Sequence, residues 1–266
     1  MSSLLISCAG DHPDFPGKTG VGFKAGFGEE EIQAFQTEAR REGKRPLIFV
    51  HGSPGKAAHW SRYFDDPELS EKYRLVAYDR PGYGNSKSGF VDFDRQVDAL
   101  AVLLKEQSRP ATLVGHSLSG AIVLAAAARY PDKVHEVVAL APSVDTKPGF
   151  VLKMNRLLRN SGLGWLLVRP WRVSHLEVLA VYPALRRLQP ELGQITAPVT
   201  VVQGGRDKLV PATSVAYLKK YLTATSPRIH LLENEGHFLP WERYGLVKRI
   251  LLGKANPGER VLHLEK

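Results

Sequence analysis

From residue 46 onward, short apolar runs rich in β-branched residues alternate with segments of helical periodicity, and this alternation restricts the fold more than any other feature. Six runs predict strands, at 47–50, 75–78, 112–114, 134–140, 199–202 and 229–232. Four segments predict helices, at 94–105, 121–129, 212–221 and 241–252. The last two follow Pro211 and Pro240, and proline suits the first turn of a helix. Such alternation predicts an α/β fold with a mostly parallel sheet flanked by helices.

Two parts of the chain depart from this alternation. Residues 10–28 are rich in Gly and Pro and predict an irregular arm, whereas residues 29–42 fit either a short helix or an alternating strand. Residues 1–45 are therefore expected to form an N-terminal arm with irregular or strand elements. Residues 146–192 contain no clear strand, and we expect them to form a small helical cap or lid inserted before the penultimate strand. The predicted core then comprises 46–145 and 193–255.

Composition excludes several classes of protein. The chain has 266 residues, of which 43% are hydrophobic and 24% charged, close to the globular average and unlike collagen, coiled coils or disordered chains. The longest uncharged stretch, Pro110–Ala128, contains Gly, His and Ser and does not predict a membrane span.

The segment Gly115-His116-Ser117-Leu118-Ser119-Gly120 lies between a predicted strand and an Ala-rich predicted helix. A sharp turn that lifts Ser117 out of a sheet leaves no room for bulky neighbours, and Gly115 and Ser119 are small. The helix dipole is aimed at the serine, and the Leu118 N–H is placed to donate to a developing negative charge. The pattern predicts Ser117 as a nucleophile; the alternative is a glycine-serine turn without a catalytic role.

A nucleophilic serine needs a base and an acid that orients it. His237 follows the last predicted strand, after Gly236, and is the predicted base; the alternative is a histidine that packs the loop. Asp207 lies just past the carboxyl end of a strand, where sites form in parallel sheets, and is predicted to hold the His237 tautomer. A helix-capping role for Asp207 and the rival carboxylate Asp145 stay open.

With the elbow and the order Ser117, Asp207, His237, the chain resembles the α/β-hydrolase superfamily over about residues 46–252. The segment 51–55, His-Gly-Ser-Pro-Gly, looks like the oxyanion-loop motif of that family, and the segment 78–86 is similar to its glycine-rich turn.

This resemblance implies an α/β-hydrolase fold in which the Ser53 N–H is a second oxyanion donor beside Leu118, while His51 shapes the loop. The elbow departs from the family in having Ser119 where Gly is usual. The N-terminal hairpin typical of the fold is not evident in residues 1–45, which implies a shortened or irregular sheet there.

The resemblance further implies a cofactor-independent serine hydrolase, most simply a carboxylic ester hydrolase that works through an acyl-enzyme on a small-molecule acyl substrate. Amide or thioester cleavage, cofactor-free haloperoxidase-like chemistry and a non-catalytic binding role are the alternatives. Relatives of this fold that attack with Asp are disfavoured, because position 117 is Ser. The predicted substrate pocket is lined by His51, Gly52, His116, Trp165 and Phe238.

The net charge of +9 is concentrated in the inserted segment. Residues 146–187 hold eight Lys and Arg and one acid, Glu177, for a net of 8 − 1 = +7. Three interpretations are open: a cap with a solvated basic face, a lid resting on an anionic lipid surface, and recognition of an acidic substrate. No nucleic-acid motif accompanies the charge.

No cofactor or metal is expected from the sequence. Gly17-Lys18-Thr19 matches the end of a P-loop motif, but the first glycine that the motif requires would be at position 12, which is His12. No metal-ligand spacing and no dinucleotide fingerprint is present.

Cys8 is the sole cysteine, so an internal disulfide is excluded. The segment Leu5–Cys8 resembles a lipobox, but only seven residues precede the cysteine and none is basic, unlike a full signal peptide. We expect a cytoplasmic protein, with a cell-envelope lipoprotein as the alternative. Nothing in the sequence sets the oligomeric state.

Overall fold

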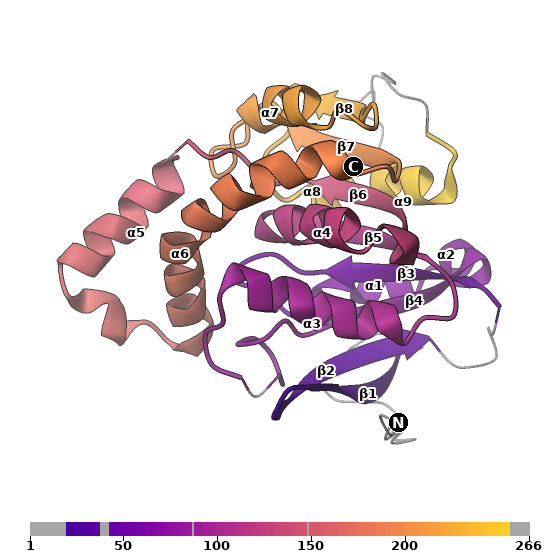
Figure 1. The fold of residues 1–266 in the computed structure, drawn as a ribbon, viewed down its shortest axis with the longest axis horizontal. Coiled ribbons are helices and arrows are strands. Elements are labelled where there is room, and N and C mark those ends of the chain that lie inside the picture. The colour runs from indigo at the N-terminus through magenta and orange to yellow at the C-terminus, as the bar shows by residue number, and fades with distance from the viewer. Residues whose placement is uncertain (1–19, 38–42, 87, 148, 256–266) are drawn as a thin grey trace.

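The computed structural model describes residues 20–37, 43–86, 88–147 and 149–255, and its eight strands form a single sheet (Figure 1). The strand order is β1-β2-β4-β3-β5-β6-β7-β8. The predicted α/β class and mostly parallel sheet are confirmed, because six strands run parallel to one another: β3 (Arg45–Val50), β4 (Tyr73–Tyr78), β5 (Ala111–His116), β6 (Val134–Leu140), β7 (Val199–Gly204) and β8 (Arg228–Leu232). Each predicted strand falls within one of them. Cys8, His12 and Gly17-Lys18-Thr19 lie outside the described residues.

The N-terminal strands correct two expectations. β1 (Gly20–Phe27) and β2 (Glu30–Thr37) form an antiparallel hairpin, and β2 also pairs antiparallel with β4. Gly28 has φ of 63° in the two-residue turn, a conformation that glycine adopts readily. The irregular arm predicted for 10–28 is therefore wrong over 20–27, and the sheet is not shortened. The glycines of β1 obscured its alternation of buried residues, Phe23, Ala25 and Phe27.

Helices cover both faces of the sheet (Figure 1). α3 (Phe93–Lys105), α4 (Leu118–Arg129) and α7 (Thr213–Tyr221) contribute to one hydrophobic cluster. The opposite cluster is formed by η2 (Ala57–Trp60), α1 (Ser61–Phe64), α2 (Pro67–Lys72), α8 (Leu239–Glu242) and α9 (Tyr244–Leu252). The helix predicted at 241–252 is thus two helices, separated at Arg243. The short η3 (Pro131–Lys133) leads into β6.

Between β6 and β7 the chain forms α5 (Phe150–Asn160), η4 (Leu163–Leu166), α6 (Arg169–Glu191) and η5 (Leu192–Gln194). We call α5, η4 and α6 the cap helices. α5 and the start of α6 project from the sheet, and α6 then bends back toward the core (Figure 1).

The second half of α6 belongs to the core by its packing. Its apolar residues join the cluster under α3 and α4. Pro183 lies inside α6, and a proline removes one hydrogen bond and bends a helix. Because α6 is one helix from Arg169 to Glu191 and its second half packs in the core cluster, it connects the other cap helices to the core. Among the described residues, no helix combines the length and apolar character needed to cross a membrane.

Candidate active site

Ser117 sits in a strained turn between β5 and α4. Its φ of 58° and ψ of −125° are unusual for a residue with a side chain. A Cβ at Gly115 would collide with the Ser119 carbonyl, and a Cβ at Gly120 would lie 2.5 Å from the Pro142 side chain. The small residues of the elbow are therefore required by close backbone packing, as the sequence pattern predicts.

The backbone holds Ser117 firmly in this turn. Its N–H donates to the Leu140 carbonyl at 2.9 Å, and its carbonyl accepts from the N–H groups of Gly120 at 2.9 Å and Ser143 at 3.0 Å. Neighbouring strand β6 thus helps to fix the serine where the helix α4 begins.

Asp207 and His237 form a buried hydrogen-bonded pair. His237 Nδ1 lies 2.7 Å from Asp207 Oδ2, and the other carboxylate oxygen accepts from the N–H groups of Leu209 and Val210, each at 2.8 Å. Burial alone would raise the pKa of Asp207, but the hydrogen bonds from His237 and these amides hold it below its ordinary value. Because a carboxylate only accepts, Nδ1 carries a proton, and the neutral form of the ring then has its lone pair on Nε2.

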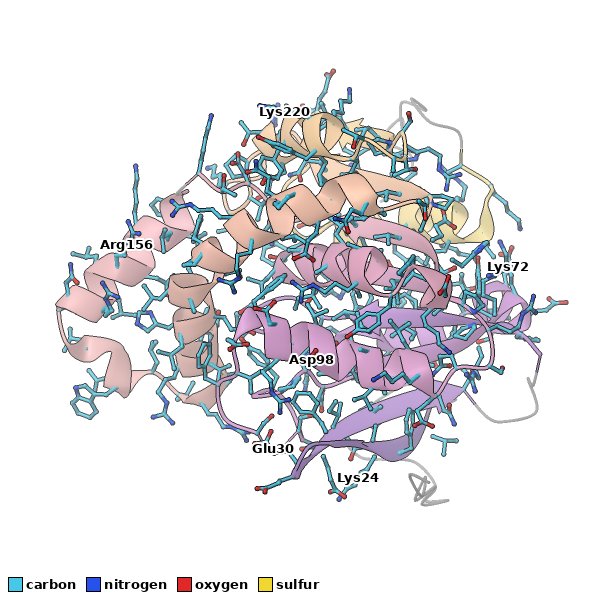
Figure 2. The ribbon with its side chains drawn as sticks, in the orientation of Figure 1. Lys24, Glu30, Lys72, Asp98, Arg156 and Lys220 are labelled. Carbon is cyan, nitrogen blue, oxygen red and sulfur yellow. The ribbon has the colours of Figure 1, made fainter. Side chains whose placement is uncertain are left out.

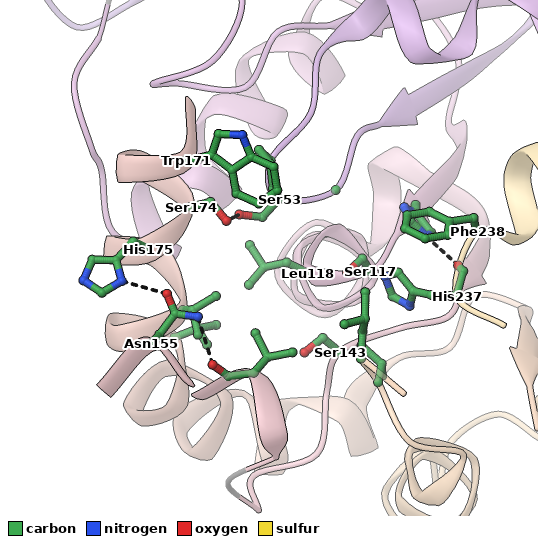
Figure 3. Close-up of a pocket in the computed structure, with 18 of the residues that line it drawn as sticks. Ser53, Ser117, Leu118, Ser143, Asn155, Trp171, Ser174, His175, His237 and Phe238 are labelled. Atoms are coloured by element: carbon green, nitrogen blue, oxygen red, sulfur yellow. Dashed lines mark hydrogen bonds between the residues drawn. The ribbon is translucent and has the colours of Figure 1, made fainter. Parts of the chain in front are cut away.

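Ser117 and His237 line the same cavity, of about 720 Å³, and Figure 3 shows them at one end of it. The rival carboxylate of Asp145 is engaged elsewhere, since it accepts from the Lys147 N–H at 2.9 Å and from the Thr213 hydroxyl at 3.1 Å. Ser117 and the Asp207–His237 pair therefore lie at the same cavity.

His116 also lines this cavity, as predicted for the pocket, and supports the His237 loop. Burial, followed by the neighbouring His237, lowers the pKa of His116 to about 3, so its ring is neutral. His116 Nε2 donates to the His237 carbonyl oxygen at 3.0 Å. His116, the residue before Ser117, thus holds the backbone of His237 in place.

The loop of residues 51–55 runs directly beside the elbow. Gly52 and Ser53 line the cavity with Leu118, and a Cβ at Gly52 would lie 3.3 Å from Ser117 Cβ. Leu118 is the first residue of α4, so its N–H has no acceptor within the helix. The Ser119 hydroxyl donates to the His51 carbonyl and ties the loop to the elbow.

His51 corrects one pocket assignment, because it is buried behind the loop and does not line the cavity. Its Nδ1 donates to the Gly52 carbonyl at 2.8 Å, and its Nε2 accepts from the Arg80 N–H at 2.9 Å. Burial, with the Arg80 charge second, holds the pKa of His51 well below its usual range.

The pocket tryptophan is also corrected. Trp165 is 71% exposed and lies outside the cavity, whereas Trp171 lines it together with Phe238, which was predicted. The residues of α6 that line the cavity recur at helical spacing: Trp171, Ser174, His175, Val178, Val181 and Tyr182. Trp165 belongs to η4, before α6 begins, and is not part of this face. This periodicity is the sequence signal that would have found Trp171.

Polar groups of the cap that we did not predict also face the cavity. His175 Nδ1 is hydrogen-bonded to Asn155 Oδ1 at 2.7 Å, and Figure 3 shows this pair across the cavity from His237. Ser174, Ser143 and His59 add further hydrogen-bonding groups to the walls. Within the described ranges, no group of three or more His, Cys, Asp or Glu is arranged to hold a metal ion.

Beside its cavity face α6 carries Glu177, the one acid of residues 146–187. Its carboxylate pairs with the buried guanidinium of Arg80 at 2.7 Å and accepts from the hydroxyls of Tyr83 at 2.5 Å and Ser53 at 2.6 Å. Arg80 in turn donates to the carbonyls of His51 and Gly52, each at 3.0 Å. A buried charge network therefore connects α6 to the loop of residues 51–55.

Comparison with known families agrees with this arrangement. The sequence matches the profile of the alpha/beta hydrolase family over residues 47–249. The chain belongs to the alpha/beta hydrolase family. The match extends from β3 to α9 and includes the elbow, the Asp207–His237 pair and the cap helices of this alpha/beta hydrolase.

Several proteins are similar to this alpha/beta hydrolase. A pimeloyl-[acyl-carrier protein] methyl ester esterase of Aeromonas hydrophila is 28% identical, over 74% of this chain and 90% of its own. The acetyltransferase component of an acetoin cleaving system of Pseudomonas putida is also 28% identical, but the chain spans only 54% of its length. An esterase from Exiguobacterium antarcticum has the same fold, with a TM-score of 0.70, 15% identity, and coverage of 86% and 97% of the two chains. The family and its esterase members support a hydrolase.

Proposed function

We propose that this protein is a serine hydrolase that cleaves carboxylic esters, with Ser117 as nucleophile, His237 as base and Asp207 as the acid that orients it. The observation that carries the proposal is the 2.7 Å hydrogen bond between Asp207 and His237 at a cavity that also contains the strained Ser117. We also propose that residues 146–192 act as the cap of a core formed by 46–145 and 193–255.

The geometry suits a two-step acyl transfer. His237 Nε2 accepts the Ser117 proton while Oγ forms a bond to the acyl carbonyl carbon. The oxyanion is held by the N–H groups of Leu118 and Ser53, and loss of one such donor costs about 10²–10³ in rate. The imidazolium, stabilised by Asp207, then protonates the departing alcohol. In the second step water attacks the acyl-enzyme with His237 again as base.

The walls of the cavity favour an apolar group on the substrate. Its lining includes the aliphatic side chains of Leu118, Val151, Leu158, Leu167 and Val178. A cavity of about 720 Å³ has the size of a typical small-molecule site. The similarity to a methyl ester esterase favours an ester over an amide, a thioester or haloperoxidase-like chemistry.

Labelling with a fluorophosphonate probe, together with a panel of p-nitrophenyl esters of increasing chain length, tests this function. We expect the wild-type protein to be labelled, and Ser117→Ala to lose labelling and at least about 10⁴ in ester turnover. Ser226→Ala is the control, because Ser226 is exposed and does not line the cavity, and it should keep both. Full labelling of Ser117→Ala contradicts the nucleophile, and an unlabelled wild type favours a non-catalytic binding role.

A further inference from the structure

The cap carries an unusual concentration of exposed apolar side chains. Among the described residues, nine of the thirteen exposed large hydrophobics lie between 150 and 176, and two more, Leu209 and Phe238, line the cavity. Exposed apolar residues that gather in one region mark an interaction surface, whereas scattered ones do not. The surface lies on one end of the molecule, where α5 and η4 project from the sheet (Figure 1).

The helix α5 divides its residues among three faces by helical spacing. Val151, Asn155 and Leu158 line the cavity. Phe150, Met154 and Leu157 recur at the same spacing one residue earlier, and all three are exposed, Leu157 by 65%. Three further exposed positions of α5 are cationic: Lys153, Arg156 and Arg159. An apolar stripe thus lies between the cavity wall and a basic row.

The turn that follows continues the apolar stripe. Leu163, Trp165 and Leu166 are exposed in η4, followed by Val168. Trp171 begins the cavity face of α6 and is itself 57% exposed, so the apolar surface reaches the mouth of the cavity.

The charges of this surface have one sign. Lys147, Arg169 and Arg172 are exposed in addition to the row on α5, and Figure 2 shows Arg156 directed away from the molecule. The only acid of residues 146–187, Glu177, is buried against Arg80 and does not offset them. We call the exposed residues of 147–172 the basic apolar surface.

We propose that the basic apolar surface docks this protein onto an anionic lipid bilayer, with the mouth of the cavity facing the membrane. Lys and Arg beside Trp, Leu and Phe form the combination that rests at a bilayer interface, where the cations meet headgroups and the apolar side chains enter the acyl boundary. A second copy of the chain is disfavoured, because it would bring two surfaces of like charge together. The cavity would then receive acyl substrates from the lipid phase, a consequence that rests on the proposed hydrolase function.

Co-sedimentation with vesicles tests the docking without turnover, using the Ser117→Ala protein. We expect binding to phosphatidylcholine vesicles that contain phosphatidylglycerol, and much weaker binding to phosphatidylcholine alone. Raising the salt from about 0.1 M to about 1 M shortens the screening length from roughly 10 Å to 3 Å and should release most of the bound protein.

Paired substitutions separate the two components of the surface. Arg156→Glu with Arg159→Glu should lower the affinity for anionic vesicles by about tenfold or more. Trp165→Ser with Leu166→Ser should weaken binding at both salt concentrations, because it removes the apolar component. The matched controls are Lys219→Glu with Lys220→Glu on α7, outside the cap (Figure 2), and Leu231→Ser, an exposed apolar residue of β8. Both controls should bind like the parent protein.

Four results would overturn the docking: no binding to either vesicle, equal loss in the controls, binding of polyglutamate in place of vesicles, or dimers abolished by the Trp165 and Leu166 changes. The third result would indicate an acidic protein partner and the fourth a second copy. Vesicle binding without fluorophosphonate labelling of the wild type would leave the surface standing and reject the hydrolase.

Discussion

At the scale of single residues, the orientation of one imidazole carries the proposed chemistry. Asp207 accepts hydrogen bonds from His237 and from two backbone amides. A side chain of the same shape at this position should therefore stay in place without the charge. Asp207→Asn should therefore fold normally but lose about 10³–10⁴ in kcat, because the ring loses its preferred tautomer and the imidazolium its partner. Ester turnover and thermal unfolding of the variant measure the two effects separately.

The control for this substitution is Asp145→Asn, which changes the rival carboxylate. Asp145 bonds to Lys147 and Thr213 rather than to His237, so its loss should leave kcat within about twofold. Equal losses of kcat in the two variants would contradict the assignment of Asp207.

At the scale of secondary-structure elements, the junction of β5 and α4 depends on the absence of side chains. A Cβ at Gly115 would meet the Ser119 carbonyl and the Val123 side chain. Gly115→Ala should therefore cost about 1–3 kcal/mol of unfolding free energy and displace Ser117, which lowers kcat as well. Urea unfolding and ester turnover provide the measurements.

Gly26→Ala is the matched strand variant, since a Cβ at Gly26 meets nothing within 4 Å. It should change neither stability nor kcat appreciably. Equal unfolding free energies and equal kcat values for Gly115→Ala and Gly26→Ala would contradict the close packing at the elbow.

At the scale of the whole molecule, the buried pair of Arg80 and Glu177 joins the cap to the core. Removing one partner leaves a buried charge, so Glu177→Ala should cost about 3–5 kcal/mol of unfolding free energy. Arg80→Met combined with Glu177→Leu should cost less than the sum of the two single changes, because both charges leave together. Chemical denaturation of the wild type, Arg80→Met, Glu177→Leu and the double variant measures this difference.

A surface ion pair between the same parts of the molecule serves as the comparison. Arg187 on α6 contacts Asp94 on α3 at 2.9 Å, and both side chains are exposed. Arg187→Ala should cost about 0–1 kcal/mol, as expected for a solvated pair. Comparable losses for Glu177→Ala and Arg187→Ala would argue against a dominant role of the buried network.

Residue patterns that are local in the sequence were sufficient to predict much of the fold. Short continuous apolar runs were sufficient to place six parallel strands, because strands with helices on both faces of the sheet are buried along most of their length. Small residues around Ser117 predicted the elbow for the same local reason, namely that neighbouring backbone leaves no room for side chains. The glycines of β1 interrupted that pattern, so the hairpin escaped prediction.

Tertiary structure alone decided which groups meet. Whether Asp207 or Asp145 faces His237 depends on where separate strands end in the sheet, and spacing along the chain does not contain that information. Likewise the placement of η4 and α6 leaves Trp165 exposed and puts Trp171 at the cavity, and the contact with Arg80 holds His51 behind its loop. The periodicity of a segment shows which of its residues share a face. Only the packing of segments against one another determines what each face contacts.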